Sequence, residues 1–308
     1  MTGRGVLRVA AVQAAPALLD LEAGLALVEQ RVERAAADGA RVVAFPETFL
    51  PGYPAWLDFS PGAALWDHPG VRMVHARLVE NAIEVPGPAA AALSRIAAAH
   101  RLTLVIGIHE RAGRTLYNTL LTFGAEGTLL NHHRKLMPTY SERMVWGLGD
   151  GAGLRTADAE GWRVGGLICW EHWMPLARQV LHDAGEDIHV AAWPAVKQMN
   201  LVASRHYAFE GRCFVIAVGG LMRTDDLPEE LPPTDPAGAL LLRGGSAIIG
   251  PDGAVLAGPS HDEETILVAD CDAGLIAQGA LTLDVSGHYS RPDVFDFAVR
   301  DSPPRRGS

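Results

Sequence analysis

Hydrophobic positions in the first fifty residues follow two different periods. An apolar run over residues 6–13, broken by only two polar side chains, predicts a strand. Apolar residues then recur at the spacing of one helix face over residues 21–38, and an Asp-Gly pair marks the end of this helix. A short apolar run at residues 41–45 predicts a second, buried strand. The order strand, helix, strand is typical of α/β sheets.

The same alternation continues along the chain and includes one hairpin. Two strand-like runs flank a turn with glycine at residues 124–127, so antiparallel pairs join the predicted sheet, which is therefore mixed. Helices are predicted over residues 71–84, 88–100, 175–181 and 201–212. Strands are predicted over residues 102–108, 117–123, 128–132, 163–169, 188–193, 213–218, 246–249 and 265–269.

Three segments lack either period. Residues 51–70 are rich in Pro, Gly and Trp and predict an irregular loop, and the acidic, proline-containing residues 225–237 predict a mobile loop. Residues 301–308 predict a disordered tail. Because neither an internal repeat nor a linker interrupts the rest, we expect residues 1–300 to form a single domain.

Charge and hydropathy narrow the possible partners. The chain has 26 basic and 36 acidic residues, a formal net charge of −10, and its basic residues do not cluster along a stretch that could follow a phosphate backbone. No apolar run approaches the roughly 18 residues that cross a bilayer, and the first apolar run is too interrupted for a signal peptide. We therefore expect a cytoplasmic protein with no nucleic-acid partner and no membrane partner.

Cysteine spacing points to a reduced compartment. The three cysteines, Cys169, Cys213 and Cys271, are too few and too scattered for a disulfide framework. No Cys-x-x-Cys pair suggests a structural zinc site. Each thiol must therefore be interpreted from its neighbours.

Three reactive side chains each follow an apolar, strand-like run: Glu47, Lys135 and Cys169. Ligands of open α/β sheets bind outside the carboxyl ends of strands. A nucleophilic thiol there needs a base and a neighbouring cation, which Glu and Lys would supply. Each residue also has an ordinary explanation, as a loop cap, a solvated strand end and a small buried hydrophobe, respectively. Spacing alone favours these ordinary explanations.

The sequences around these three residues resemble the nitrilase family of carbon–nitrogen hydrolases. The order Glu, Lys, Cys also matches that family, and the resemblance extends from Leu7 to Phe297. The matching stretches are FPE at 45–47, PGYP at 51–54, HRKLMPT at 133–139 and GGLICWE at 165–171, with supporting ones such as YNTL at 117–120 and EGRCFV at 210–215. The stretch GHYSRPDVF at 287–295 resembles the nitrilase branch of the family.

This resemblance implies both an architecture and a set of roles. The fold would be an α-β-β-α sandwich with mixed sheets, and no metal and no cofactor would be required. Cys169 would be the nucleophile, Glu47 the general base and acid, Lys135 the stabiliser of the anionic intermediate, and Glu142 would orient groups near the nucleophile. A surface ion pair with Arg143 is the alternative explanation of Glu142.

The resemblance also implies assembly. Members of the family pair into homodimers, and often into larger oligomers or spirals. The usual pairing surface is formed by the helix after Cys169 and the helix around residues 201–210. We therefore expect a homodimer or a larger oligomer.

The implied chemistry is hydrolysis of a small-molecule nitrile. Attack by Cys169 would give a thioimidate, water would convert it to a thioester with loss of ammonia, and a second water would release the carboxylic acid. Trp170-Glu171 after the cysteine and the stretch 135–151 favour a nitrilase over an amidase of the same superfamily. A cyanide-degrading enzyme is a further alternative.

Aromatic residues near the motifs are candidates for a substrate pocket. We expect only two or three of five aromatic residues to touch substrate, because most aromatic side chains belong to cores. The five are Tyr53, Trp56, Trp146, Trp170 and Trp193. Residue types alone leave aliphatic, arylaliphatic and aromatic nitriles open. The predicted substrate-binding residues are Tyr53, Trp146, Trp170, Trp193 and Pro194.

Three other classes of function are less compatible with the sequence. A metal enzyme is disfavoured because the adjacent His132 and His133 point to opposite faces of a strand and no His-Glu-x-x-His motif is present. A redox role for Cys169 is disfavoured because no second cysteine is near it in sequence. A catalytically silent binding protein is disfavoured because competent residue types fill all four reactive positions.

Overall fold

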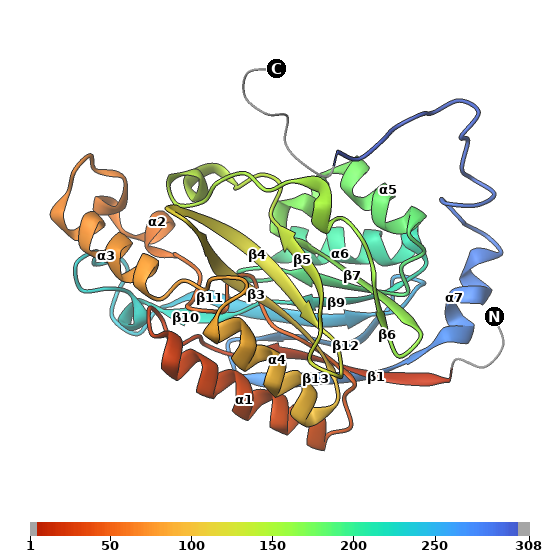
Figure 1. Cartoon of the computed structure of the whole chain (residues 1–308), viewed down its shortest axis with the longest axis horizontal. Coiled ribbons are helices and arrows are strands. Elements are labelled where there is room, and N and C mark those ends of the chain that lie inside the picture. Colours follow the sequence, from red (N-terminus) through yellow and green to blue (C-terminus); the bar gives the residue numbers. More distant parts are fainter. Residues whose placement is uncertain (1–4, 301–308) are drawn as a thin grey trace.

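The protein, seen here as a computed structural model that describes residues 5–300, is built from two β-sheets lying face to face between two layers of helices (Figure 1). This layered order is the predicted α-β-β-α sandwich, so the predicted fold is confirmed. The predicted disordered tail, residues 301–308, lies outside the described residues.

Both sheets are mixed, as the sequence predicted. The first sheet has the strand order β13 (Thr265–Asp272), β1 (Val6–Gln13), β2 (Val42–Ala44), β3 (Thr103–Ala112), β4 (Thr115–Phe123) and β5 (Leu129–Arg134). The second has the order β10 (Leu221–Arg223), β11 (Leu240–Ile249), β9 (Phe214–Val218), β8 (Ile188–Ala192), β7 (Trp162–Ile168) and β6 (Ala157–Ala159), and β12 (Val255–His261) pairs with β11.

Strand direction decides which loops share an edge. In the first sheet β1, β2 and β3 are parallel, and β5 runs the same way because β3–β4 and β4–β5 are both antiparallel pairs. In the second sheet β7, β8 and β9 are parallel. The loops that follow β2 and β5 therefore leave one edge of their sheet together, and so do the loops that follow β7 and β8.

Apolar stripes on the helices explain the layers. α1 (Leu21–Ala37) and α4 (Pro88–His100) cover the first sheet, and α5 (Pro175–Asp183) and α6 (Gln198–Gly211) cover the second (Figure 1). Val28 and Leu93 pack with the sheet residue Leu104 in one buried cluster. Val9 and Ile216, from opposite sheets, share a second cluster that also includes residues of α5 and α6. The two faces of each sheet are thus both apolar, as the continuous hydrophobic runs predicted.

Elements that the sequence did not predict are short or exposed. α2 (Trp56–Phe59) and a 3₁₀ helix (Pro61–Ala64) lie in the predicted irregular loop, and α3 (Pro69–Glu80) begins just before the predicted helix. β6 and β10 have three residues each, and β12 is mostly exposed, so neither length nor alternation marks them. α7 (Ala273–Ala280) is only eight residues long and has no buried residue, although Ala273 and Ile276 pack against the core at its edge. None of the helices within residues 5–300 is long and apolar enough to span a membrane.

The predicted mobile loop at residues 225–237 packs against the rest of the molecule. Leu227 and Leu231 are buried in a cluster with Leu78 of α3, and the Ser60 hydroxyl donates to the Leu231 carbonyl at 2.6 Å. The acidic and proline residues that suggested mobility are interspersed with these two leucines. The composition of a loop does not show whether a few of its apolar residues reach a core.

Gln13, at the end of β1, is a buried polar side chain that joins strands distant in sequence. Its Nε2 donates to the carbonyls of Ser260 at 3.1 Å and Glu263 at 2.9 Å, and its Oε1 accepts from Ser246 N at 2.9 Å. The residue is 1% exposed, so water cannot replace these partners.

We predict that Gln13→Leu lowers the free energy of unfolding by about 2–4 kcal/mol, because a side chain of similar size leaves buried backbone groups unpaired. Urea or guanidinium unfolding monitored by circular dichroism would measure this change. Gln278→Leu on exposed α7 is the matched control and should stay within about 0.5 kcal/mol of the unaltered protein. Equal stability of the two variants would contradict the structural role of Gln13.

Candidate active site

The three predicted reactive residues meet at the edge where the parallel strands end. Glu47 lies in the loop after β2, Lys135 directly follows β5, and Cys169 directly follows β7. Glu47 N donates to the carbonyl of Trp193, which directly follows β8, at 3.3 Å. This hydrogen bond connects the edges of the two sheets, so residues from both sheets form one site.

Lys135 is the centre of the site. Its Nζ lies 2.7 Å from Glu47 Oε1 and 2.7 Å from Glu142 Oε2, and its side chain is completely buried. Asn118 Nδ2 also donates to Glu47 Oε1, at 2.6 Å. Burial opposes the charge of Lys135, but the neighbouring Glu47, Cys169 and Glu142 outweigh this effect and raise its pKa. Lys135 is therefore a permanent cation here.

Glu142 is held on several sides. Its Oε2 also accepts from Thr139 N at 2.6 Å, and its Oε1 accepts from the Tyr53 hydroxyl at 3.0 Å. Glu142 is 2% exposed, which excludes the alternative of a surface ion pair with Arg143. The Nε of Arg143 instead donates to the carbonyl of Pro138. Glu142 thus fixes one side of the Lys135 ammonium.

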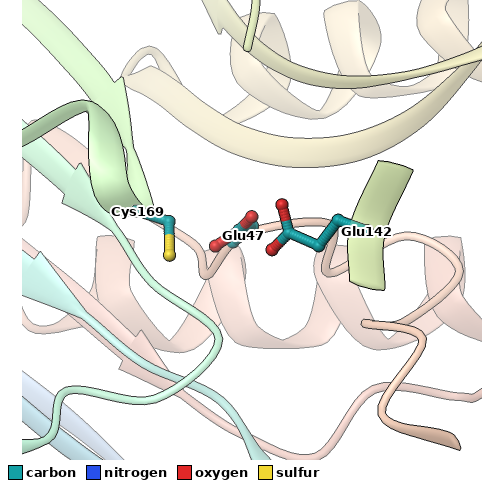
Figure 2. Close-up of side chains that lie close together, drawn as sticks. All are labelled: Glu47, Glu142 and Cys169. Atoms are coloured by element: carbon teal, nitrogen blue, oxygen red, sulfur yellow. The ribbon is translucent and has the colours of Figure 1, made fainter. Parts of the chain in front are cut away.

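Glu47 lies between Cys169 and Glu142, as Figure 2 shows. One side-chain atom from each of these three residues lies within 4.8 Å of the others. Glu47 Oε2 is buried and has no hydrogen-bond partner among residues 5–300, which leaves it as an acceptor for the thiol proton.

Burial and charge set the protonation states of this pair. Burial, opposed by Lys135 and reinforced by Glu142, raises the pKa of Glu47 to about 7. Burial and Glu47 raise the pKa of the Cys169 thiol well above its ordinary value, although Lys135 opposes the rise. The resting thiol is therefore protonated, and Glu47 is poised to take its proton near neutral pH.

A group of two carboxylates and a thiol can also suit a metal ion. Here, however, the Lys135 ammonium already bonds both carboxylates and supplies the positive charge. His132 and His133 point to different carboxylates, Glu110 and Glu171 respectively, as the strand geometry predicted.

The backbone around Cys169 is held on both sides. Cys169 has a φ of 54°, a left-handed conformation that is uncommon for a residue with a side chain. Ile168 N donates to Glu171 Oε2 at 2.7 Å, and the Cys169 carbonyl lies 2.7 Å from His172 Nδ1. These contacts stabilise the unusual turn that presents the sulfur.

Glu171 also connects the nucleophile to the lysine loop. Its Oε1 accepts from Leu136 N at 2.8 Å, and His133 Nε2 lies 3.0 Å from Oε2. Burial opposes ionisation of Glu171, but His133 and the two backbone N–H groups outweigh burial and lower its pKa. Sequence reasoning used Glu171 only as a marker of the nitrilase branch, and its place two residues after the cysteine was the signal for this linking role.

A cavity of about 470 Å³ opens onto Cys169 and Glu142. Of the five predicted substrate-binding residues, four line it: Tyr53, Trp170, Trp193 and Pro194. Further lining residues, which sequence reasoning did not name as substrate-binding, come from α2, β11, α6 and two loops, and of these only Thr139 lies in a motif: Asp58, Phe59, Thr139, Lys197, Met199 and Leu242.

Trp146 lies outside the lining of this cavity. Its ring is buried behind the site, 5.8 Å from Lys135 Nζ, and its Nε1 donates to His109 Nδ1 at 3.0 Å. Trp56 is likewise buried and does not line the cavity. Three of the five candidate aromatics therefore reach the cavity, and the structure assigns Trp146 a position next to the lysine.

We predict that Glu171→Gln lowers kcat by about 10- to 100-fold, because an amide NH₂ would face a backbone N–H and displace the Cys169 or Lys135 loop. Steady-state kinetics, with circular dichroism to check folding, would measure this effect. Glu160→Gln, which neutralises an exposed carboxylate paired with Arg41, is the control and should retain full activity. Full activity of folded Glu171→Gln would contradict the linking role.

Known proteins with similar sequences show which family the chain belongs to. The family model of the carbon–nitrogen hydrolases matches residues 8–280. The chain is 41% identical over 298 residues to an aliphatic nitrilase of Sinorhizobium fredii, with 96% of each chain covered. It is 39% identical over 308 residues to a bifunctional nitrilase/nitrile hydratase of Lupinus angustifolius, covering 96% of this chain and 86% of that protein.

Solved structures share the fold at lower identity. A carbon–nitrogen hydrolase superfamily protein of Xanthomonas campestris, crystallised with an arsenic adduct in its active site, has a TM-score of 0.72 at 19% identity, covering 96% of this chain and 100% of that one. An amidase from a Nesterenkonia species has a TM-score of 0.64 at 20% identity, covering 89% of this chain and 94% of that one. These likenesses support the sandwich fold, and the sequence relatives decide the family. The chain belongs to the carbon–nitrogen hydrolase family, and within it to the nitrilase branch.

Proposed function

We propose that the protein is a nitrilase that hydrolyses a small organic nitrile to its carboxylic acid and ammonia, with Cys169 as the nucleophile. The observation that carries this proposal is the buried cluster in which Lys135 Nζ bridges Glu47 and Glu142 beside the Cys169 thiol. The 41% identity to the aliphatic nitrilase of Sinorhizobium fredii supports nitriles as the class of substrate.

In the first step Glu47 removes the proton of the Cys169 thiol while the sulfur adds to the nitrile carbon. A carbon–sulfur bond forms, one π bond of the nitrile breaks, and the nitrogen takes up the proton, which gives a thioimidate. Lys135 stabilises the negative charge that develops on nitrogen, because its ammonium is buried and fixed by two carboxylates.

In the second stage water is the nucleophile. Glu47 removes a proton from a water that adds to the thioimidate, and the tetrahedral intermediate expels ammonia to leave a thioester. A second water, activated in the same way, releases the carboxylic acid and restores the thiol. Two waters are consumed for each nitrile, and these steps use only protein side chains and water.

The cavity favours a nitrile that carries an organic substituent. Its volume of about 470 Å³ exceeds what cyanide needs, and the rings of Tyr53, Trp170 and Trp193 offer apolar contact. This is the observation that favours an organic nitrile over cyanide. An amidase of the same superfamily is the second candidate, because the same cluster can attack an amide carbonyl.

We also propose a homodimer or larger oligomer in the cytoplasm, with the chain up to residue 300 as a single domain. Large apolar side chains are exposed on α5 and α6, among them Leu176, Val202 and Phe209, which supports pairing through these helices. All three cysteines are free and buried, which supports a reduced compartment. Light scattering of the purified protein would test the assembly.

We predict that matched aliphatic, arylaliphatic and aromatic nitriles release ammonia and acid, while the corresponding amides are inert. Ammonia assays with product identification would rank the substituents that the cavity accepts. Cys169→Ala should abolish turnover and leave the fold intact, because only one sulfur is lost. Turnover of amides alone would move the protein to the amidase function.

We predict that kcat/KM for an uncharged nitrile falls as pH decreases through about 7, the pKa of Glu47. The sign follows from its role: the base form of Glu47 exists above this pKa and is lost below it. A pH–rate profile over a range in which the protein stays folded would reveal this acid limb. A rate that stays constant down to about pH 5 would exclude Glu47 as the base.

A further inference from the structure

A second group of buried titratable residues contacts the backbone of Cys169. His172 Nδ1 lies 2.7 Å from the Cys169 carbonyl, and His172 Nε2 lies 2.9 Å from His189 Nε2. His189 Nδ1 lies 2.9 Å from Glu186 Oε1, and the Tyr207 hydroxyl donates to Glu186 Oε2 at 2.6 Å. We call Glu186, His189 and His172 the histidine chain.

The histidine chain is sealed within the protein. His172 follows Cys169 in the same 3₁₀ helix, His189 belongs to β8, and Tyr207 belongs to α6. Their side chains are 0–2% exposed, and Glu186 is 5% exposed. None of these residues lines the substrate cavity. His172 stacks on Trp193, which does line it, at 4.6 Å between ring centroids.

Hydrogen-bond polarity fixes how many protons the histidine chain must hold. Three contacts join Cys169 O, His172, His189 and Glu186, and each contact needs one proton. Cys169 O can only accept, so His172 Nδ1 carries a proton. A neutral His172 then accepts at Nε2, so His189 Nε2 must donate. A neutral His189 has no second proton, so the third proton must come from Glu186.

We propose that Glu186, His189 and His172 are positioning residues that hold the Cys169 carbonyl through a chain carrying one proton more than two neutral imidazoles supply, with that proton on Glu186. The proposal rests on the role of Cys169 as nucleophile. If this proton is removed, two lone pairs face each other at one of the three contacts. The turn around Cys169, already in a left-handed conformation, then loses a support.

The surroundings favour a protonated Glu186. Burial raises its pKa to about 8, with Tyr207 and His182 opposing and Asp187 adding to the rise. Burial lowers the pKa of His172 to about 3 and holds the pKa of His189 well below its ordinary value. Both imidazoles are therefore neutral, which is the condition under which the third proton lies on Glu186.

Other charged groups near the histidine chain are already paired. The carboxylate of Glu210 on α6 bonds Arg178 Nε at 2.7 Å and His182 Nε2 at 3.3 Å on α5. Glu171, which directly precedes His172, bonds His133. Asp187 accepts from Arg163 N at 2.8 Å. Tyr207 of α6 and the buried thiol of Cys213, which directly precedes β9, also face this region.

Gly165 of β7 makes room for the Glu186 carboxyl of the histidine chain. A Cβ at Gly165 would clash with Glu186 Oε1, so only glycine lets the carboxyl reach His189 from this side. Gly165 begins the GGLICWE stretch that marked the family in the sequence. The motif thus contains both the nucleophile and the space for the group that supports its backbone.

The variant Glu186→Gln tests whether position 186 must donate a hydrogen bond to His189 or must carry a negative charge. Its amide nitrogen can donate to His189 Nδ1 and its amide oxygen can accept from Tyr207, so it imitates protonated Glu186 at every pH. The unaltered protein should lose kcat above about pH 8, where Glu186 ionises. We expect Glu186→Gln to keep kcat within about threefold near neutral pH and to retain activity about one pH unit further into the alkaline range. KM should change little, because no residue of the histidine chain lines the substrate cavity.

Asp183→Asn is the matched control, since this exposed carboxylate lies on α5 and contacts Gln179 but not the histidine chain. It should keep the pH profile of the unaltered protein. An alkaline limb that Glu186→Gln leaves unchanged would overturn the proposal. So would a folded Glu186→Gln protein with activity lowered about 100-fold near neutral pH, because the ionised carboxylate would then be the required form.

A direct measurement covers the case in which Glu186→Gln does not fold. Nitrogen-15 NMR of labelled histidines, or neutron diffraction, would report the protonated ring nitrogens of the unaltered protein near pH 7. We expect a proton on Nδ1 of His172 and on Nε2 of His189. A proton on Nε2 of His172 and none on its Nδ1 would overturn the proposal. Because this measurement does not depend on turnover, the failure of the nitrilase function would be recognised separately.

Discussion

The Lys135 ammonium between two buried carboxylates is the interaction on which the site depends. A lysine without exposed surface is tolerated only because Glu47 and Glu142 both lie 2.7 Å from its Nζ. Burial raises the pKa of Glu47 to about 7 and Glu142 adds to this rise, although Lys135 opposes it. The two carboxylates therefore keep the cation in place, and their burial gives Glu47 the pKa of a base that works near neutral pH.

The position of the nucleophile depends on both sheets. Glu171 bonds the backbone on either side of the site, at Ile168 and Leu136, and so couples the end of β7 to the residue after Lys135. The hydrogen bond from Glu47 N to the Trp193 carbonyl couples β2 to β8 in the same way. Chemistry and fold stability are thus linked, since separation of the sheets would disperse the reactive groups.

Much of this arrangement could be predicted from the sequence, and the limits have physical causes. The reactive residues were found because each directly follows an apolar strand, and the family motifs selected their roles. Trp146 shows where such reasoning stops, because the sequence places it near the site but does not show that its ring faces Lys135 from behind. The lining residues Lys197 and Leu242 were missed because they come from segments without a motif, brought together only by packing. The histidine chain was missed because its contacts depend on the 3₁₀ helix after β7 packing beside β8.

The central claim is that the thiol of Cys169, activated by this cluster, bonds the carbon of the nitrile. The most direct test is to quench the protein with acid during turnover of a nitrile and to map the modified peptides by mass spectrometry. The account predicts an acyl or imidoyl adduct on the peptide that contains Cys169, with a mass that follows the nitrile used. An adduct on Cys213, Cys271 or another residue that forms and decays at the rate of turnover would contradict it.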